Sequence, residues 1–104
     1  MRDDSFAGER LSQEFEQSIR ELNDRHIRAA TGGVRKDHFL RAAENVARLR
    51  ALYLTAVLRL ETGSEPPPPE QFEELRELRR AFEEALRGFA ALRHALKRGY
   101  FALA

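Results

Sequence analysis

The three histidines are the first residues in this sequence that could bind a metal or move a proton. They stand at positions 26, 38 and 94. None has a second histidine four residues away, and none follows a glutamate at the Glu-x-x-His spacing of di-iron helical bundles. The sequence therefore predicts no metal site and no cofactor. We expect His26 to be a core or interface residue, and His38, beside Asp37, to be a helix-start residue rather than a general base.

The carboxylates and the glycine pair do not point to catalysis either. The 17 acidic residues alternate with arginines along the chain, so no two of them are set apart as an acid and a base. Gly32-Gly33 precedes Val34-Arg35-Lys36 without the G-x-x-x-x-G-K-[ST] spacing of a phosphate-binding P-loop. Cysteine is absent, so thiolate chemistry is excluded. We predict that the protein is not an enzyme.

Two groups of helix-breaking residues divide the chain into three periodic segments. Gly32-Gly33 stands after the first segment, and Gly63 with the run Pro66 to Pro69 stands after the second. Glycine is typical just past the end of a helix, and proline is typical of the first helical turn. The pattern predicts helices over about 5–30, 37–62 and 68–98 or beyond.

Short connections between these helices predict an all-α fold, a three-helix antiparallel bundle that runs up, down and up. A chain of 104 residues fits one domain, so residues 1–104 are assigned to a single helical domain. No run of about 18 apolar residues and no signal-peptide pattern is present, so we expect a cytoplasmic protein without a membrane span.

Charge is unevenly distributed in this arrangement, although the net charge is only +1. Residues 24–41 and 87–104 meet at one end and carry a surplus of positive charge, whereas residues 2–16 and 61–77 meet at the other end and carry a surplus of negative charge. Acids near helix N-termini and bases near C-termini complement the helix dipole, which explains the gradient of the third helix. Cations at the start of the second helix oppose the dipole and need another explanation.

We expect that explanation to be the binding of an anion or of a partner, with a merely solvated surface as the alternative. The predicted site is the basic cluster, which we define as Arg25, Arg28, Arg35, Lys36, Arg41, Lys97 and Arg98. Its partner is either the acidic end of a second copy or a phosphate.

The second helix indicates self-association, because its apolar arc covers about 220° of the circumference and exceeds what one neighbour hides. The apolar segment at 100–104 is expected to pack on a partner subunit, with a loose handle for another protein as the alternative. The predicted oligomer interface comprises Arg50, Leu52, Tyr53, Arg93, Tyr100, Phe101 and Leu103.

Two of these interface residues are arginines within apolar stripes, and a buried guanidinium needs a partner. Counting along the helices places Arg50 level with Glu16 and Glu83, and Arg93 level with Asp37. We predict these ion pairs, with the alternative that both arginines reach past the core to water.

Together these patterns favour a small non-enzymatic interaction protein, such as an adaptor, a regulatory subunit or a chaperone-like factor. It would act through homo-oligomerisation, as a dimer or higher, and through binding of another protein. A less favoured alternative is an accessory factor that binds nucleic acid through the basic cluster. A third class, a bundle that encloses a small ligand, needs a cavity that the sequence does not reveal.

Overall fold

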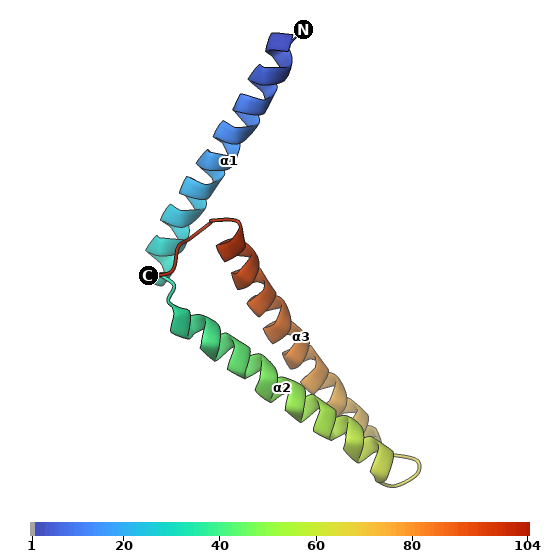
Figure 1. The fold of residues 1–104 in the computed structure, drawn as a ribbon. Helices are drawn as coiled ribbons and strands as arrows, with labels where there is room; N and C mark the ends of the chain where they lie inside the picture. Colours follow the sequence, from blue (N-terminus) through green and yellow to red (C-terminus); the bar gives the residue numbers. More distant parts are fainter. Residues whose placement is uncertain (1) are drawn as a thin grey trace. The chain divides into compact units, whose positions relative to one another are not determined.

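Three α-helices joined by two short connections make up the computed structural model (Figure 1). They are α1 (Arg2–Thr31), α2 (Lys36–Thr62) and α3 (Pro69–Lys97). The structure describes the backbone of residues 2–104 and the side chains of residues 6–104. Within that part of the chain there is no strand, and the predicted all-α fold of three helices is confirmed.

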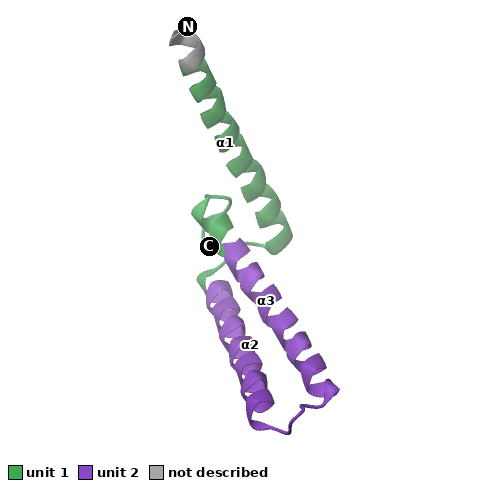
Figure 2. Cartoon of the chain, turned by 90° about the vertical axis from the view of Figure 1, so that its right-hand side faces the viewer, with its two compact units in different colours: residues 1–36, 93–104 green, residues 37–92 purple. Residues whose placement is uncertain are grey.

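The chain divides into two compact units, which Figure 2 shows in green and purple. Unit 1 joins the residues up to Lys36 with Arg93–Ala104, and unit 2 is Asp37–Leu92. Unit 1 therefore contains α1 and the last turn of α3, and unit 2 contains most of α2 and α3. The assignment of residues 1–104 to one domain stays a prediction.

Glycine ends α1. The N–H of Gly32 donates to the carbonyl of Arg28 at 2.9 Å, and Gly32 has a φ of 76°. This is the left-handed conformation that glycine adopts without the steric cost of a Cβ. The hydroxyl of Thr31 adds a second cap, because it accepts the N–H of Gly33 at 3.1 Å. The predicted glycine stop is thus realised by specific hydrogen bonds.

Glycine also ends α3, in a Schellman motif. The N–H of Gly99 donates to the carbonyl of Leu96 at 3.1 Å, and the N–H of Tyr100 donates to the carbonyl of Ala95 at 2.9 Å. Gly99 has a φ of 75°, and the ring of Tyr100 packs edge-on against His94 with centroids 6.3 Å apart. The chain leaves the helix here, so residues 100–104 do not extend α3.

The segment after α3 folds back within unit 1. The N–H of Ala104 donates to the carbonyl of Val34 at 2.8 Å, which ties this segment to the connection between α1 and α2. Val34 and Phe101 are 5% and 6% exposed. They are two of the four apolar side chains that are buried among the described residues.

In unit 2, α2 and α3 lie side by side and antiparallel (Figures 1 and 2). Phe39 meets Phe89 edge to face with ring centroids 6.5 Å apart, and Tyr53 stacks on Phe82 at 6.1 Å. The buried residues of this helical hairpin are Val46 and Ala56. The two aromatic pairs, Phe39–Phe89 and Tyr53–Phe82, thus fix how the two helices pack.

None of the helices within residues 2–104 combines the length and the apolar character needed to span a bilayer.

Candidate interaction surfaces

A stripe of apolar side chains runs along α1 and is exposed. Leu11, Phe15, Ile19 and Leu22 recur at steps of three and four, which place them on one side of the helix. They are exposed by 50%, 63%, 46% and 47%. Burial of a side chain of this size removes about 1.5–3 kcal/mol of unfavourable hydration. The stripe is therefore a surface that favours coverage by another apolar face.

A second exposed stripe lies on α2. One side of α2 packs against α3 through Val46, Tyr53 and Ala56. A different side, roughly 140° around the helix at 100° per residue, carries Leu40 and, at steps of fourteen and four, Leu54 and Leu58. These three leucines are exposed by 60%, 51% and 64%. The wide apolar arc predicted from the sequence thus resolves into a packed side and an uncovered side.

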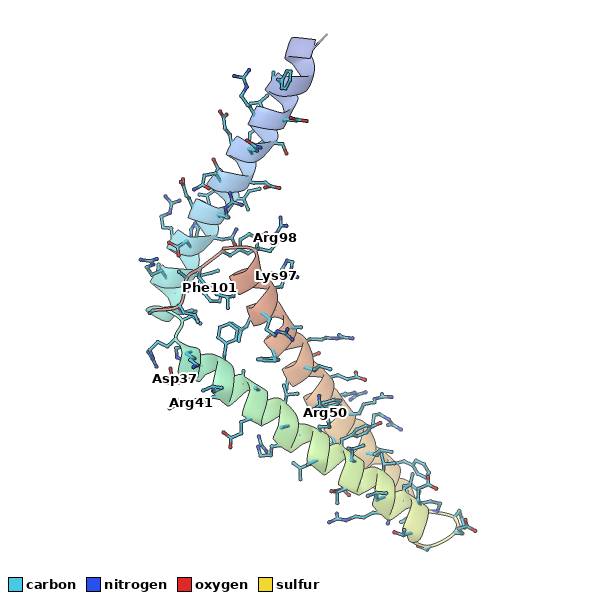
Figure 3. All side chains as sticks on the ribbon, in the orientation of Figure 1. Asp37, Arg41, Arg50, Lys97, Arg98 and Phe101 are labelled. Atoms are coloured by element: carbon cyan, nitrogen blue, oxygen red, sulfur yellow. The ribbon has the colours of Figure 1, made fainter. Side chains whose placement is uncertain are left out.

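The predicted interface residues of unit 2 have different surroundings. Leu52 is 44% exposed and lies outside the Leu40–Leu58 stripe. Tyr53 is half-buried by its stacking on Phe82. Arg50, which is labelled in Figure 3, is exposed. Its guanidinium carbon lies 5.3 Å from the centre of the Phe82 ring.

The expected ion pair between Arg50 and Glu83 does not form among the described side chains. Glu83 lies 4.0 Å from the guanidinium of Arg79, which stands one turn earlier on the same helix. A partner at i−4 is available without the entropy cost of fixing a contact between two helices. Glu16 belongs to unit 1 and lies 3.9 Å from Arg20 of its own helix, and its predicted ion pair with Arg50 stays a prediction. Within unit 2, Arg50 has an aromatic partner in place of Glu83.

The predicted interface residues of unit 1 lie around the folded-back segment. Phe101 is buried in its own chain, Tyr100 is half-buried, and Leu103 is 43% exposed. Arg93 is exposed. Arg93 and Asp37 belong to different units, and their predicted ion pair stays a prediction.

The structure brings most of the basic cluster into one unit. Six of its seven residues belong to unit 1, and Arg41 belongs to unit 2. All seven side chains are exposed (Figure 3 labels Arg41, Lys97 and Arg98). Arg28 contacts both carboxylate oxygens of Asp24 at 3.1 Å. Within the basic cluster, the side chains that form no ion pair with any other described residue are Arg25, Lys36, Arg41, Lys97 and Arg98.

The acidic residues opposite this cluster in the sequence-based arrangement are split between the units. Glu9, Glu14 and Glu16 lie in the first half of α1, and the acids of residues 61–77 lie in unit 2. The side chains of Arg2, Asp3 and Asp4 fall outside the described residues.

Unit 2 has a shallow hollow beside Tyr53, the residue that stacks on Phe82. Its volume is about 190 Å³, and it is lined by Tyr53, Phe72, Leu75, Arg76 and Arg79. Pockets for small molecules usually have about 300–1,000 Å³. This hollow is therefore too small and open to enclose a cofactor-sized ligand. Across residues 6–104, histidines and carboxylates do not gather in threes as a metal site would require.

Three features of these surfaces go beyond the sequence-based expectations. Val34 is buried although it stands alone between glycines and cations, and Phe39 pairs with Phe89. Phe101 is covered by its own chain. Two features of the sequence could have indicated the burial of Val34 and Phe101. They are the lone apolar residue in a polar connection and Gly99, which ends α3 and lets the segment turn back.

Comparison with known protein families, with curated proteins and with solved structures finds no match to this chain.

Proposed function

We propose that this chain is a non-enzymatic interaction protein that self-associates through apolar helix faces and in that form binds a further protein. The observation that carries the proposal is the exposure of Leu40, Leu54 and Leu58 by 51–64% on the side of α2 that does not face α3. A pair of helices buries one side of each helix, and a second pair covers the remaining sides in a four-helix bundle.

The energetics support this assembly. Val46 and Ala56 are the only buried side chains among the described residues of unit 2. This is a small hydrophobic core for two helices of this length. Covering three leucines on each of two subunits adds several kcal/mol of hydrophobic stabilisation, by the figure of about 1.5–3 kcal/mol for each side chain. An isologous dimer supplies that cover with the same surface from both subunits.

A charged residue placed in the exposed leucine stripe of α2 tests the proposal. Leu54→Glu is expected to lower the mass of the oligomer, because a carboxylate would be buried between two apolar faces of α2 without a partner. The measurement is the mass in solution by light scattering, with circular dichroism to show that the helices remain.

Thr55→Glu is the matched control. It introduces the same charge one residue later, on an exposed and more polar side of α2, and should leave the mass unchanged. A wild-type protein that is monomeric at about 100 μM, or two variants with equal masses, would contradict the proposal.

A second candidate function is the binding of phosphate groups on a nucleic acid. Arg25, Lys36, Lys97 and Arg98 favour it, since they are exposed in one compact unit and form no ion pair with the described residues. Cations of this kind release counterions when they neutralise phosphates, so affinity falls steeply with salt. Contacts to phosphates carry no sequence information, so such binding would be largely independent of sequence.

The test compares two triple variants of equal net charge. Arg25→Ser, Lys36→Ser and Arg98→Ser together should abolish the mobility shift of a DNA or RNA duplex in low salt. The same change at three arginines of unit 2, Arg48, Arg59 and Arg80, should leave most of it. Equal losses would indicate a general charge effect and would contradict a site in unit 1.

A further inference from the structure

The apolar stripe of α1 is a different surface from the stripe of α2. Within unit 1, the segment after α3 approaches α1 at Arg20 and bonds to the connection that follows α1. A Cβ at Gly99 would approach the side chain of Arg20 at 3.1 Å, and Ala104 bonds to Val34. Phe15, Ile19 and Leu22 remain exposed by 46–63%.

Phe15, Ile19 and Leu22 of this stripe belong to a longer seam whose spacing is the same in both directions. The seam positions are separated by steps of three, four, three, four and three residues, and they are Ser12, Phe15, Ile19, Leu22, His26 and Ala29. This alternation is the heptad spacing that lets two helices interlock along a continuous seam. If two copies of α1 run antiparallel about the midpoint between residues 20 and 21, every seam position faces another seam position.

In this register the central apolar residues face each other. Ile19 of one copy is level with Leu22 of the other, and Phe15 is level with His26, and each pair occurs twice. Near the ends of the seam Ser12 is level with Ala29, a pair of small side chains that lets the two helices approach. The seam covers 17 residue steps, or about 25 Å at 1.5 Å per residue. Leu11 widens the stripe at one edge and adds a further apolar contact.

The charges of α1 complement each other in an antiparallel pair. Among the described side chains, the half before Ser18 carries Glu9, Glu14 and Glu16 against Arg10, and the later half carries a surplus of arginine. Glu14 and Arg25 lie on the same flank of the stripe at 100° per residue. Their distances from the midpoint differ by two residues, which is about 3 Å along the axis. Antiparallel pairing thus brings Glu14 of each copy close to Arg25 of the other.

We propose that α1 pairs with α1 of a second copy as an antiparallel coiled coil centred between Arg20 and Glu21. The inference rests on the proposed self-association and names a second surface for it, the α1 stripe. A parallel pair would set the acidic first halves of the two helices beside each other and the basic later halves likewise, so the charges oppose that orientation. The α1 stripe is accordingly covered by α1 of a second copy, which runs in the opposite direction.

The absence of cysteine from the sequence allows a direct test by disulfide formation. Ser12→Cys and Ala29→Cys are prepared as separate full-length variants, one with a mass tag, and are mixed under mild oxidation. Antiparallel pairing predicts a disulfide between the two variants in most of the protein. It also predicts little product from either variant alone, because positions 12 and 12 would lie about 25 Å apart.

Gln13→Cys is the matched control, since it lies one residue along on the opposite side of α1. Mixed with Ala29→Cys, it should give less than about a tenth of the cross-linked product. Disulfides between positions 12 and 12 would show a parallel pair and would overturn the proposal. Equal yields from positions 12 and 13 would show random collision and would also overturn it.

The solution mass separates the failure of this inference from the failure of self-association. An oligomeric mass without a 12–29 disulfide would leave the proposed function in place and would contradict pairing through α1. A monomeric mass without a disulfide would contradict both.

Discussion

The guanidinium carbon of Arg50 on α2 lies 5.3 Å from the centre of the Phe82 ring on α3. The same ring also stacks with Tyr53 at a centroid distance of 6.1 Å and an interplanar angle of 13°. Three side chains from two helices therefore form one group of contacts. A guanidinium over a ring is attracted by the ring quadrupole without losing its access to water. This explains how an arginine is accommodated within an otherwise apolar stretch of α2.

Replacing Arg50 with glutamine should lower the free energy of unfolding by about 0.5–1 kcal/mol, the usual value of an exposed cation–π contact. Thermal unfolding followed by circular dichroism, at one fixed protein concentration, measures the change. Arg59→Gln is the control, because Arg59 is an exposed arginine of the same helix without a ring contact among the described residues. The two variants would have the same stability if the contact contributed nothing.

The burial of Phe101 predicts a much larger effect. Phe101→Ala removes a side chain that is 6% exposed, and truncation of a buried phenylalanine costs about 3–5 kcal/mol. Leu103→Ala, two residues later and 43% exposed, should cost less than about 1 kcal/mol. Chemical denaturation gives both values. A small loss for Phe101→Ala would mean that the folded-back segment does not contribute to the stability of unit 1.

The number and limits of the helices could be predicted from the sequence because local chemistry decides them. Gly32 and Gly99 take left-handed conformations that only glycine adopts easily, and Pro69 is the first residue of α3. The hydrogen bonds at these ends involve residues within five positions of each other. Signals of this kind are readable from a few consecutive residues.

The partners of individual side chains could not be predicted in the same way. Counting residues placed Arg50 and Glu83 at the same level of two helices, which is necessary for an ion pair but not sufficient. Arg79 is closer to Glu83 along its own helix, and the ring of Phe82 is available to Arg50. The sequence also showed that Phe101 needs cover, but an apolar side chain carries no information about which apolar surface provides it.

Three glycines that differ in conformation or in surroundings allow backbone strain to be separated from contact. Gly88→Ala lies inside α3 with nothing within 4 Å of the added Cβ, so helix propensity should stabilise the protein by about 1 kcal/mol. Gly32→Ala should destabilise it by about 1 kcal/mol, since Gly32 has a φ of 76° and free space around it. Gly99→Ala adds a 3.1 Å approach to the side chain of Arg20 and should cost at least as much. Midpoints of thermal unfolding in the order Gly88→Ala, wild type, Gly32→Ala, Gly99→Ala would agree with this account, and a stabilising Gly99→Ala would contradict it.

A charge exchange on α1 tests the orientation of the coiled coil by energy rather than by cross-linking. Arg25→Glu should weaken self-association roughly tenfold, because two Glu14–Arg25 attractions in each dimer become repulsions of a few tenths to about 1 kcal/mol each. Adding Glu14→Arg restores opposite charges on the same flank and should recover most of the affinity, as measured by sedimentation equilibrium. Arg28→Glu serves as the control, since Arg28 pairs with Asp24 of its own helix and lies farther from the seam, so Glu14→Arg should not rescue it. Both effects should shrink in about 1 M salt, where the Debye length falls to about 3 Å. Failure of Glu14→Arg to rescue Arg25→Glu would argue against the antiparallel register, whatever the mass of the wild-type protein.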